Sequence, residues 1–315
     1  MNVLQLYSSN PVLAVLIPIL GAAIPMTLLF SYTGLGFMIG TLQIKGIRTG
    51  RSAYDKAARQ LAVLALILGW ALLVVSRIWI FFKSDGYVPQ SFLATMVELS
   101  WGIFGFAVIA SSIHFAMWKP LANHRGIHAF LGFFAGLNGT FALFVLLGAL
   151  RLVTAVSLPN AAELSLYDLF NFRVIPSPLV NAAALVLPLS LALPASAALV
   201  WLIVRRNKDD FGRDYYNTML SWCGRWGMVA WGLVTVLFLV SAGLDIRPLL
   251  DQPNPIPPQE LAIVAVRVLL PLIICATMAA VGKSTLPMRL KPWMILAFFL
   301  GMPSAYFVFK WATSF

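Results

Sequence analysis

The chain has 315 residues, of which 60% are hydrophobic and only 10% are charged, and its mean hydropathy is +0.88. Soluble globular proteins carry about 25% charged residues, so an ordinary soluble domain is excluded. Disorder is excluded as well, because this much apolar surface does not stay solvated. The apolar runs are continuous rather than alternating, which disfavours a transmembrane β-barrel. The composition therefore predicts an all-α, polytopic membrane helix bundle.

Eight apolar runs follow one another, each long enough for the ~20 residues that one helical crossing needs. No internal repeat and no soluble domain interrupts them, so residues 1–315 are expected to form a single membrane domain. The longest connection, after the fourth run, is expected to hold a short interfacial helix near 161–170. We predict about eight transmembrane helices, at approximately 11–44, 57–82, 92–118, 127–155, 177–204, 217–244, 259–282 and 290–313.

Basic residues outnumber acidic ones by 22 to 11, giving a net charge of +11. Fifteen of the 22 basic residues lie in or beside alternate connections, namely the first, third, fifth and seventh. The positive-inside rule then places these connections in the cytoplasm and both termini outside, which agrees with an even number of spans. The basic surplus is explained in this way without nucleic acid as a partner.

Few residues carry a recognisable chemical pattern. The sequence has no P-loop, no nucleotide-binding fingerprint and no Ser/His/Asp constellation. Cys223 and Cys275 lie in separate apolar runs, without the spacing of cysteine metal sites. We therefore assign no catalytic residue, and the candidate functional residues are the polar ones within the spans.

Histidines occur only around the connection between the third and fourth runs, as His114, His124 and His128. A helical hairpin brings His114 and His128 to the same membrane edge. Two imidazoles from adjacent helices are able to ligate one b-type haem axially, which makes His114 and His128 the candidate ligands of a haem iron. The alternative is a pair of interfacial histidines that bond to headgroups, to loop carbonyls or to each other.

Arg267 lies inside the seventh apolar run, where a guanidinium requires a carboxylate, carbonyls or an anionic ligand. One interpretation is structural: the side chain reaches the outer surface or pairs with Glu98 or Glu260. The other is functional: Arg267 contacts a haem propionate or a quinone carbonyl. Arg267 is thus a candidate cofactor-binding residue alongside the histidines.

A resemblance to a known family is carried by Arg51-Ser-Ala-Tyr-Asp-Lys-Ala-Ala-Arg59, Phe115-Ala-Met-Trp118, Asn123-His-Arg-Gly-Ile-His128, Leu137-Asn-Gly139, 213–227, Pro257-Pro258 and Val266-Arg267-Val268-Leu269. In this order, these segments resemble subunit I of the cytochrome bd-type quinol oxidases. In that family an Arg of the seventh helix lies two residues before a Met that ligates haem, and Arg267 stands at this place. The resemblance implies the same helical bundle, a bacterial-type inner membrane, quinone as cofactor and respiratory partner subunits.

The haem ligands of that family have no counterpart in this chain. No histidine precedes His114, Asn181 stands near the place of the fifth-helix haem His, and Leu269 replaces the seventh-helix Met. The long quinol-binding loop after the sixth helix is also missing. The resemblance therefore implies the fold without oxygen reduction by this chain alone.

We expect an integral membrane subunit of a respiratory electron-transfer complex, depleted of haem, that supports electron transfer between membrane quinone and a cofactor-bearing partner. Its expected partners are the lipid bilayer and other membrane or cytochrome subunits. A quinone near Arg267 and one b-type haem on His114 and His128 are the cofactors considered. The alternatives are a transporter or channel of unrelated class, disfavoured by the sparse intramembrane charge, and an active quinol oxidase subunit.

Overall fold

The computed structural model describes residues 11–83, 92–155, 178–250 and 257–313. Within these ranges the chain forms eight long α-helices and one short 3-10 helix, η3. They are α2 (Pro11–Thr49), α3 (Ser52–Lys83), α4 (Phe92–Ala116), α5 (Arg125–Ala155), α7 (Pro178–Arg205), α8 (Arg213–Leu250), α9 (Pro258–Lys283), η3 (Pro287–Leu290) and α10 (Lys291–Thr313).

Every predicted membrane helix is confirmed in its existence and approximate place. Eight helices are long and apolar enough to cross a membrane. Most are longer than the apolar runs, because polar residues at the ends continue the backbone hydrogen bonding; α8, for example, continues to Leu250. The interfacial helix expected near 161–170 falls outside the described residues.

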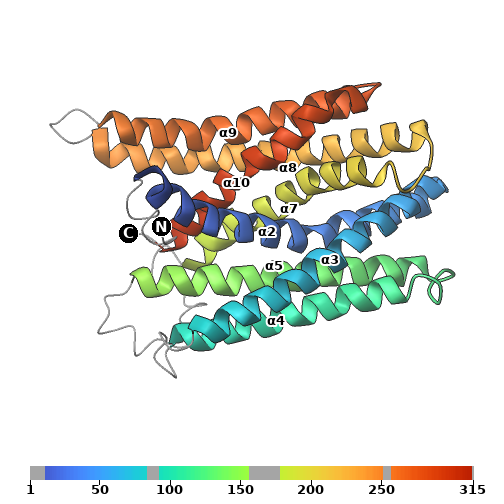
Figure 1. The fold of residues 1–315 in the computed structure, drawn as a ribbon, viewed down its shortest axis with the longest axis horizontal. Coiled ribbons are helices and arrows are strands. Elements are labelled where there is room, and N and C mark those ends of the chain that lie inside the picture. The colour runs from blue at the N-terminus through green and yellow to red at the C-terminus, as the bar shows by residue number, and fades with distance from the viewer. Residues whose placement is uncertain (1–10, 84–91, 156–177, 251–256, 314–315) are drawn as a thin grey trace, which may run out of the picture.

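The helices run roughly along one direction (Figure 1). The most buried helices are α2 and α7, which pack against each other in the middle of the bundle. To one side lie α3, α4 and α5, and to the other lie α8, α9 and α10 (Figure 1). The least buried helix is α9, which packs against α8 and α10. Because α9 is peripheral, most of its apolar surface is available to lipid.

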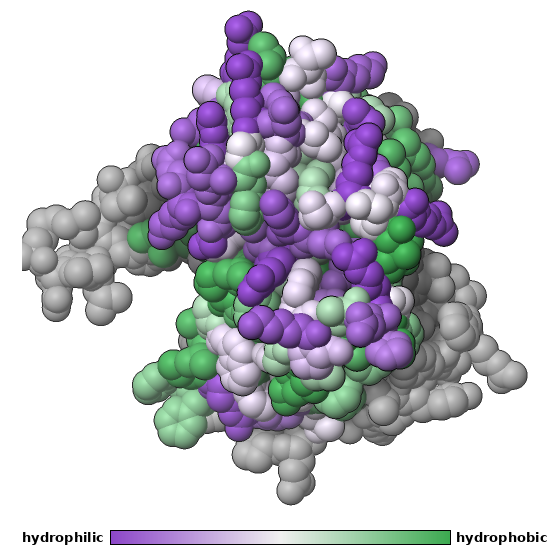
Figure 2. Space-filling model, turned by 90° about the vertical axis from the view of Figure 1, so that its right-hand side faces the viewer, coloured by the Kyte–Doolittle hydropathy of each residue, from purple (hydrophilic) through white to green (hydrophobic). Residues whose placement is uncertain are grey.

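Alternate connections gather at one end of the bundle. The first, third, fifth and seventh connections meet at the right-hand end in Figure 1, whereas α2 begins and α10 ends at the left. We call the right-hand end, formed by residues 49–52, 117–124, 206–212 and 284–290, the basic end. Figure 2 views this end and shows hydrophilic residues spread across it. The arrangement agrees with the predicted pattern of connections, while the cytoplasmic location of the basic end stays a prediction.

Small residues allow α2 to touch its neighbours through the backbone. A Cβ atom added to Gly34 would lie 1.4 Å from the carbonyl oxygen of Ser190 on α7. A Cβ on Gly36 would lie 2.5 Å from backbone atoms of Gly132 and Gly136 on α5. Such close approach is the usual way in which membrane helices gain packing contacts without a hydrophobic driving force. Around Gly34 and Gly36, the backbone of α2 is therefore in direct contact with the backbones of α7 and α5.

Candidate functional site

The predicted histidine pair is brought together at the basic end. His114 lies two residues before the end of α4, and His128 lies in the first turn of α5. The side chains are buried, with 2% and 5% of their surface exposed. Their rings stack in parallel, with centroids 4.1 Å apart and 6° between the planes. Trp118, from the connection, packs edge-on against both rings at 5.5 Å and 4.7 Å.

Gln43, near the end of α2, joins the two histidines. Its amide nitrogen is 2.7 Å from Nδ1 of His128, and its amide oxygen is 3.2 Å from Nε2 of His114. The remaining nitrogen of His128, Nε2, is 2.7 Å from the carbonyl oxygen of His114. These contacts tie three helices, α2, α4 and α5, into one buried polar cluster, which we call the Gln43 cluster (Gln43, His114 and His128).

The hydrogen-bond partners set the donor and acceptor roles of three of the four ring nitrogens. A carbonyl oxygen only accepts, so His128 donates from Nε2 and is left with a lone pair at Nδ1. That lone pair accepts from the Gln43 amide nitrogen, which turns the amide oxygen towards His114. His114 then donates from Nε2. In this pattern each of the three hydrogen bonds has one donor and one acceptor.

This geometry does not fit a haem held between His114 and His128. An axial ligand must present the lone pair of a ring nitrogen to the iron. On His128 the Nδ1 lone pair is taken by Gln43 and Nε2 holds a proton, and on His114 Nε2 donates to Gln43. Two axial ligands also stand on opposite faces of the porphyrin, whereas these rings are stacked face to face. The contacts are instead with the Gln43 amide and with the backbone carbonyl of His114 inside α4, whereas the alternative drawn from the sequence named headgroups, loop carbonyls or each other.

Arg267 lies elsewhere in the bundle. It is half-buried on α9, nine residues after the helix begins at Pro258. At 1.5 Å per residue it is about 14 Å from that end of α9 and roughly 24 Å from the basic end of the same helix. The structure therefore does not bring Arg267 together with the histidine pair, and a single site containing all three candidate residues is excluded.

Glu98, one of the predicted partners of Arg267, is engaged by another arginine. Both of its carboxylate oxygens accept from Nη1 of Arg77 on α3, at 2.8 Å and 2.6 Å. The guanidinium of Arg77 also lies over the ring of Trp101, 4.9 Å from its centroid. Glu98 belongs to α4, on the opposite side of the bundle from α9 (Figure 1). The predicted pairing of Glu98 with Arg267 is therefore wrong, because an adjacent helix supplies a closer cation.

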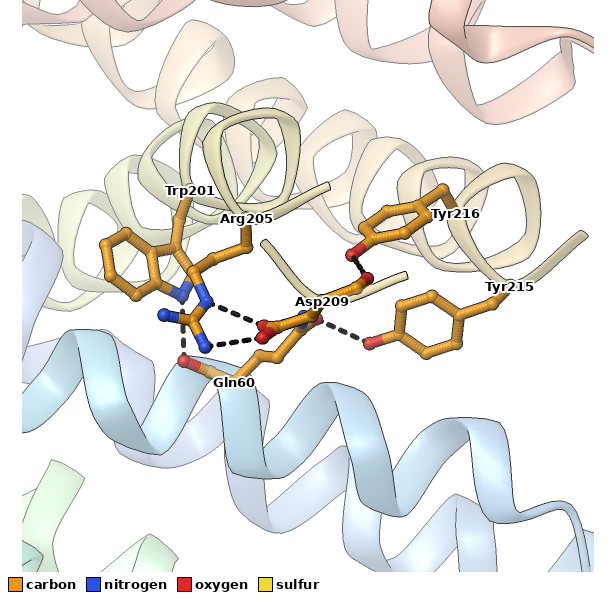
Figure 3. A network of polar contacts seen from close by, with 6 residues as sticks. All are labelled: Gln60, Trp201, Arg205, Asp209, Tyr215 and Tyr216. Atoms are coloured by element: carbon orange, nitrogen blue, oxygen red, sulfur yellow. Dashed lines mark hydrogen bonds and ion pairs between the residues drawn. The ribbon is translucent and has the colours of Figure 1, made fainter. Parts of the chain in front are cut away.

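A second polar network ties the connection between α7 and α8 to α3 (Figure 3). Asp209 accepts from Nε and Nη2 of Arg205 at 2.6 Å and 2.7 Å, and from the amide of Gln60 at 2.8 Å. The amide oxygen of Gln60 accepts from the Tyr215 hydroxyl at 2.6 Å, and its backbone carbonyl accepts from the Trp201 indole at 2.8 Å. The network fixes the geometry of the basic end.

The charge state of Asp209 follows from its contacts. Burial raises the pKa of its carboxyl, but hydrogen bonds from Gln60 and Arg205, together with the charges of Arg205 and Lys208, outweigh burial. The net effect lowers the pKa below its usual value, so Asp209 is a carboxylate at neutral pH.

Sequence reasoning found the histidines but missed the glutamines that organise the basic end. Gln43 and Gln60 are uncharged and each lies at the polar margin of an apolar run, where amides are common and carry no distinctive spacing. The available signal was that polar side chains entering a span usually bond to a neighbouring helix. That signal does not predict which neighbouring helix supplies the hydrogen-bond partner.

Neither a protein-family model nor a curated protein matches this chain. Among solved structures, the bd oxidase from Geobacillus thermodenitrificans is similar, with a TM-score of 0.62 over 94% of this chain and 86% of the other. The two sequences are 12% identical over this match. At that identity the likeness concerns the fold, and it agrees with the architecture predicted above. The chain thus has a distant bd-oxidase-like fold, a bundle of membrane-spanning helices.

Proposed function

We propose that this chain is the membrane-embedded scaffold subunit of a respiratory electron-transfer complex, in which a partner subunit carries the haem. The observation that carries the proposal is the likeness to bd oxidase over nearly the whole chain. The likeness extends from the first described helix to the last, so it concerns the complete bundle rather than one helical hairpin.

Two features support the absence of haem from the proposed subunit. In the Gln43 cluster both nitrogens of His128 and Nε2 of His114 are engaged in hydrogen bonds, which supports a structural role for the two imidazoles. Leu269, which stands at the place of the family's Met ligand, has 51% of its surface exposed on the outer face of the bundle. A side chain directed outwards at that position is suited to lipid and unsuited to an enclosed cofactor.

Arg267 would contact the membrane quinone. Arg267 is half-buried on a peripheral helix, and this position supports the approach of an amphiphilic ligand from the bilayer. Val266 and Leu269 beside it are exposed and apolar, as a surface in contact with a quinone tail requires. A guanidinium is a strong hydrogen-bond donor to carbonyl oxygens, so Arg267 would bind the quinone headgroup.

The decisive experiment compares the chain purified alone with the complex isolated from its native membrane. Reduced-minus-oxidised visible spectra and pyridine haemochrome quantification are recorded on both. We expect haem and quinol-dependent electron transfer in the complex, and no stoichiometric haem in the isolated chain. Stoichiometric haem in the isolated chain, or a native preparation without any redox cofactor, would refute the proposal; the latter result would favour the transporter or channel.

The role of Arg267 is tested in the assembled complex. R267Q is expected to lower quinone-dependent electron transfer without loss of assembly, and the apparent affinity for quinone should fall. R77Q is the matched control, because Arg77 also lies towards the end opposite the basic end and its described partner is Glu98. If R267Q and R77Q showed equal quinone-dependent electron transfer, Arg267 would not be a quinone contact.

A further inference from the structure

A small cavity of ≈ 60 Å³ opens at the basic end, and three arginines line it. They come from separate elements: Arg206 follows α7, Arg213 begins α8, and Arg289 belongs to η3. The other lining residues are Tyr216, Asn217, Leu286 and Met288. The cavity therefore combines cationic groups with hydrogen-bonding and apolar side chains.

The cavity is lined by cations without an acidic partner among its lining residues. Its lining includes neither aspartate nor glutamate. The ion pairs found among the described residues involve other cations, Arg77, Arg125 and Arg205. Asp209, although close in sequence, is occupied by Arg205 and Gln60. Three guanidinium groups around one small cavity repel each other, and an anion between them would reverse that repulsion.

The wall of the cavity is held in place by the network shown in Figure 3. The Tyr216 hydroxyl donates to the backbone carbonyl of Asp209, and the carboxylate of Asp209 is fixed by Arg205 and Gln60. Arg213 stands at the beginning of α8, where the helix dipole adds positive potential. Positioned walls reduce the entropy that is lost when a ligand binds.

We propose that this cavity binds a phosphate group. Guanidinium groups bind phosphate oxygens through paired hydrogen bonds, and Asn217 adds an amide able to donate to an oxygen. We infer that the phosphate belongs to an anionic phospholipid of the adjoining leaflet, because Leu286 and Met288 supply apolar surface and the cavity lies where helices end at the headgroup level. The inference is independent of the proposed electron-transfer role.

The test uses the full chain in detergent and in nanodiscs. Binding of dioleoylphosphatidylglycerol and of dioleoylphosphatidylcholine is measured by native mass spectrometry, and thermal unfolding is measured with each lipid. A second arm titrates inorganic phosphate against the detergent-solubilised chain. The test variant is R206Q/R213Q/R289Q. The matched control is R48Q/R51Q/R59Q, which removes the same charge from exposed arginines at the same end but outside the cavity.

We expect wild type and the control to bind the anionic lipid in preference to the zwitterionic one. The cavity variant should bind the anionic lipid with an apparent affinity roughly tenfold or more below that of wild type, as expected from the loss of several charge-assisted bonds. It should also lose the increase in unfolding temperature that the anionic lipid gives to wild type. If inorganic phosphate stabilises the chain through the same three arginines and the lipid does not, the site is confirmed with a soluble phosphate as its ligand. Equal losses in the two variants, or no binding of either probe, would overturn the proposal.

Discussion

Replacing Gln43 with Met removes the amide that joins α2 to both histidines while nearly preserving side-chain volume. The change leaves the Nε2 proton of His114 and the Nδ1 lone pair of His128 without their partner, at side chains 2% and 5% exposed. An unsatisfied buried polar group costs roughly 1–3 kcal/mol, which gives about 2–6 kcal/mol for two such groups.

Hydrogen-bond energies measured in membrane proteins indicate a smaller cost than this ~2–6 kcal/mol. Hydrogen bonds between membrane helices average about 0.6 kcal/mol, because the unfolded chain in lipid also finds partners. Two such bonds would contribute only about 1 kcal/mol. The Gln43 cluster is buried but lies near helix ends, where relaxation admits water. We therefore expect Q43M to destabilise the fold by about 2 kcal/mol, a change of up to ~30-fold in the folding equilibrium.

The assay is equilibrium unfolding in mixed micelles of a mild detergent and sodium dodecyl sulfate. A double-mutant cycle combines Q43M with H128F and should give a coupling of about 1 kcal/mol, since the two side chains share a hydrogen bond. H124F is the matched control, because His124 is exposed and outside the cluster. Coupling of Q43M to H128F below about 0.3 kcal/mol, the level of independent sites, would refute the bridging role of Gln43.

Three further predictions concern acid stability, helix packing and topology. The lowered pKa of Asp209 means that its carboxylate stabilises the folded state above about pH 4, which is the pKa of Asp in an unfolded chain. This stabilisation is lost as the pH falls through the lowered pKa of the folded state. Thermal unfolding of wild type and D209N should therefore differ at pH 6 and converge in strong acid, and a constant difference would contradict the assignment. G34A places a methyl group against the α7 carbonyl and should cost at least about 1–3 kcal/mol; G102A, which meets nothing within 4 Å, should be neutral or slightly stabilising on the same unfolding assay. With both native cysteines replaced, S52C should be protected from impermeant thiol reagents added to intact cells, and Q259C should be labelled; the reverse pattern would invert the predicted topology.

The number, order and approximate bounds of the membrane helices followed from sequence alone. An apolar run of more than about 20 residues must form a helix in lipid, because every backbone polar group has to be satisfied within the segment. Chain connectivity also predicted which helix ends are neighbours, because a short connection between two helices places their ends side by side. His114 and His128 were expected to be close for this reason, and their rings are stacked in the structure.

The partners of each polar side chain required the tertiary structure. Both α2 and α4 are apolar on nearly all sides, so their sequences do not mark which face turns inward. In lipid, the core and the surroundings of a helix are similarly apolar, and rotation about the helix axis is set by close packing of small residues and by interhelical hydrogen bonds. That rotation decided that Gln43 joins the histidines and that Arg77 pairs with Glu98.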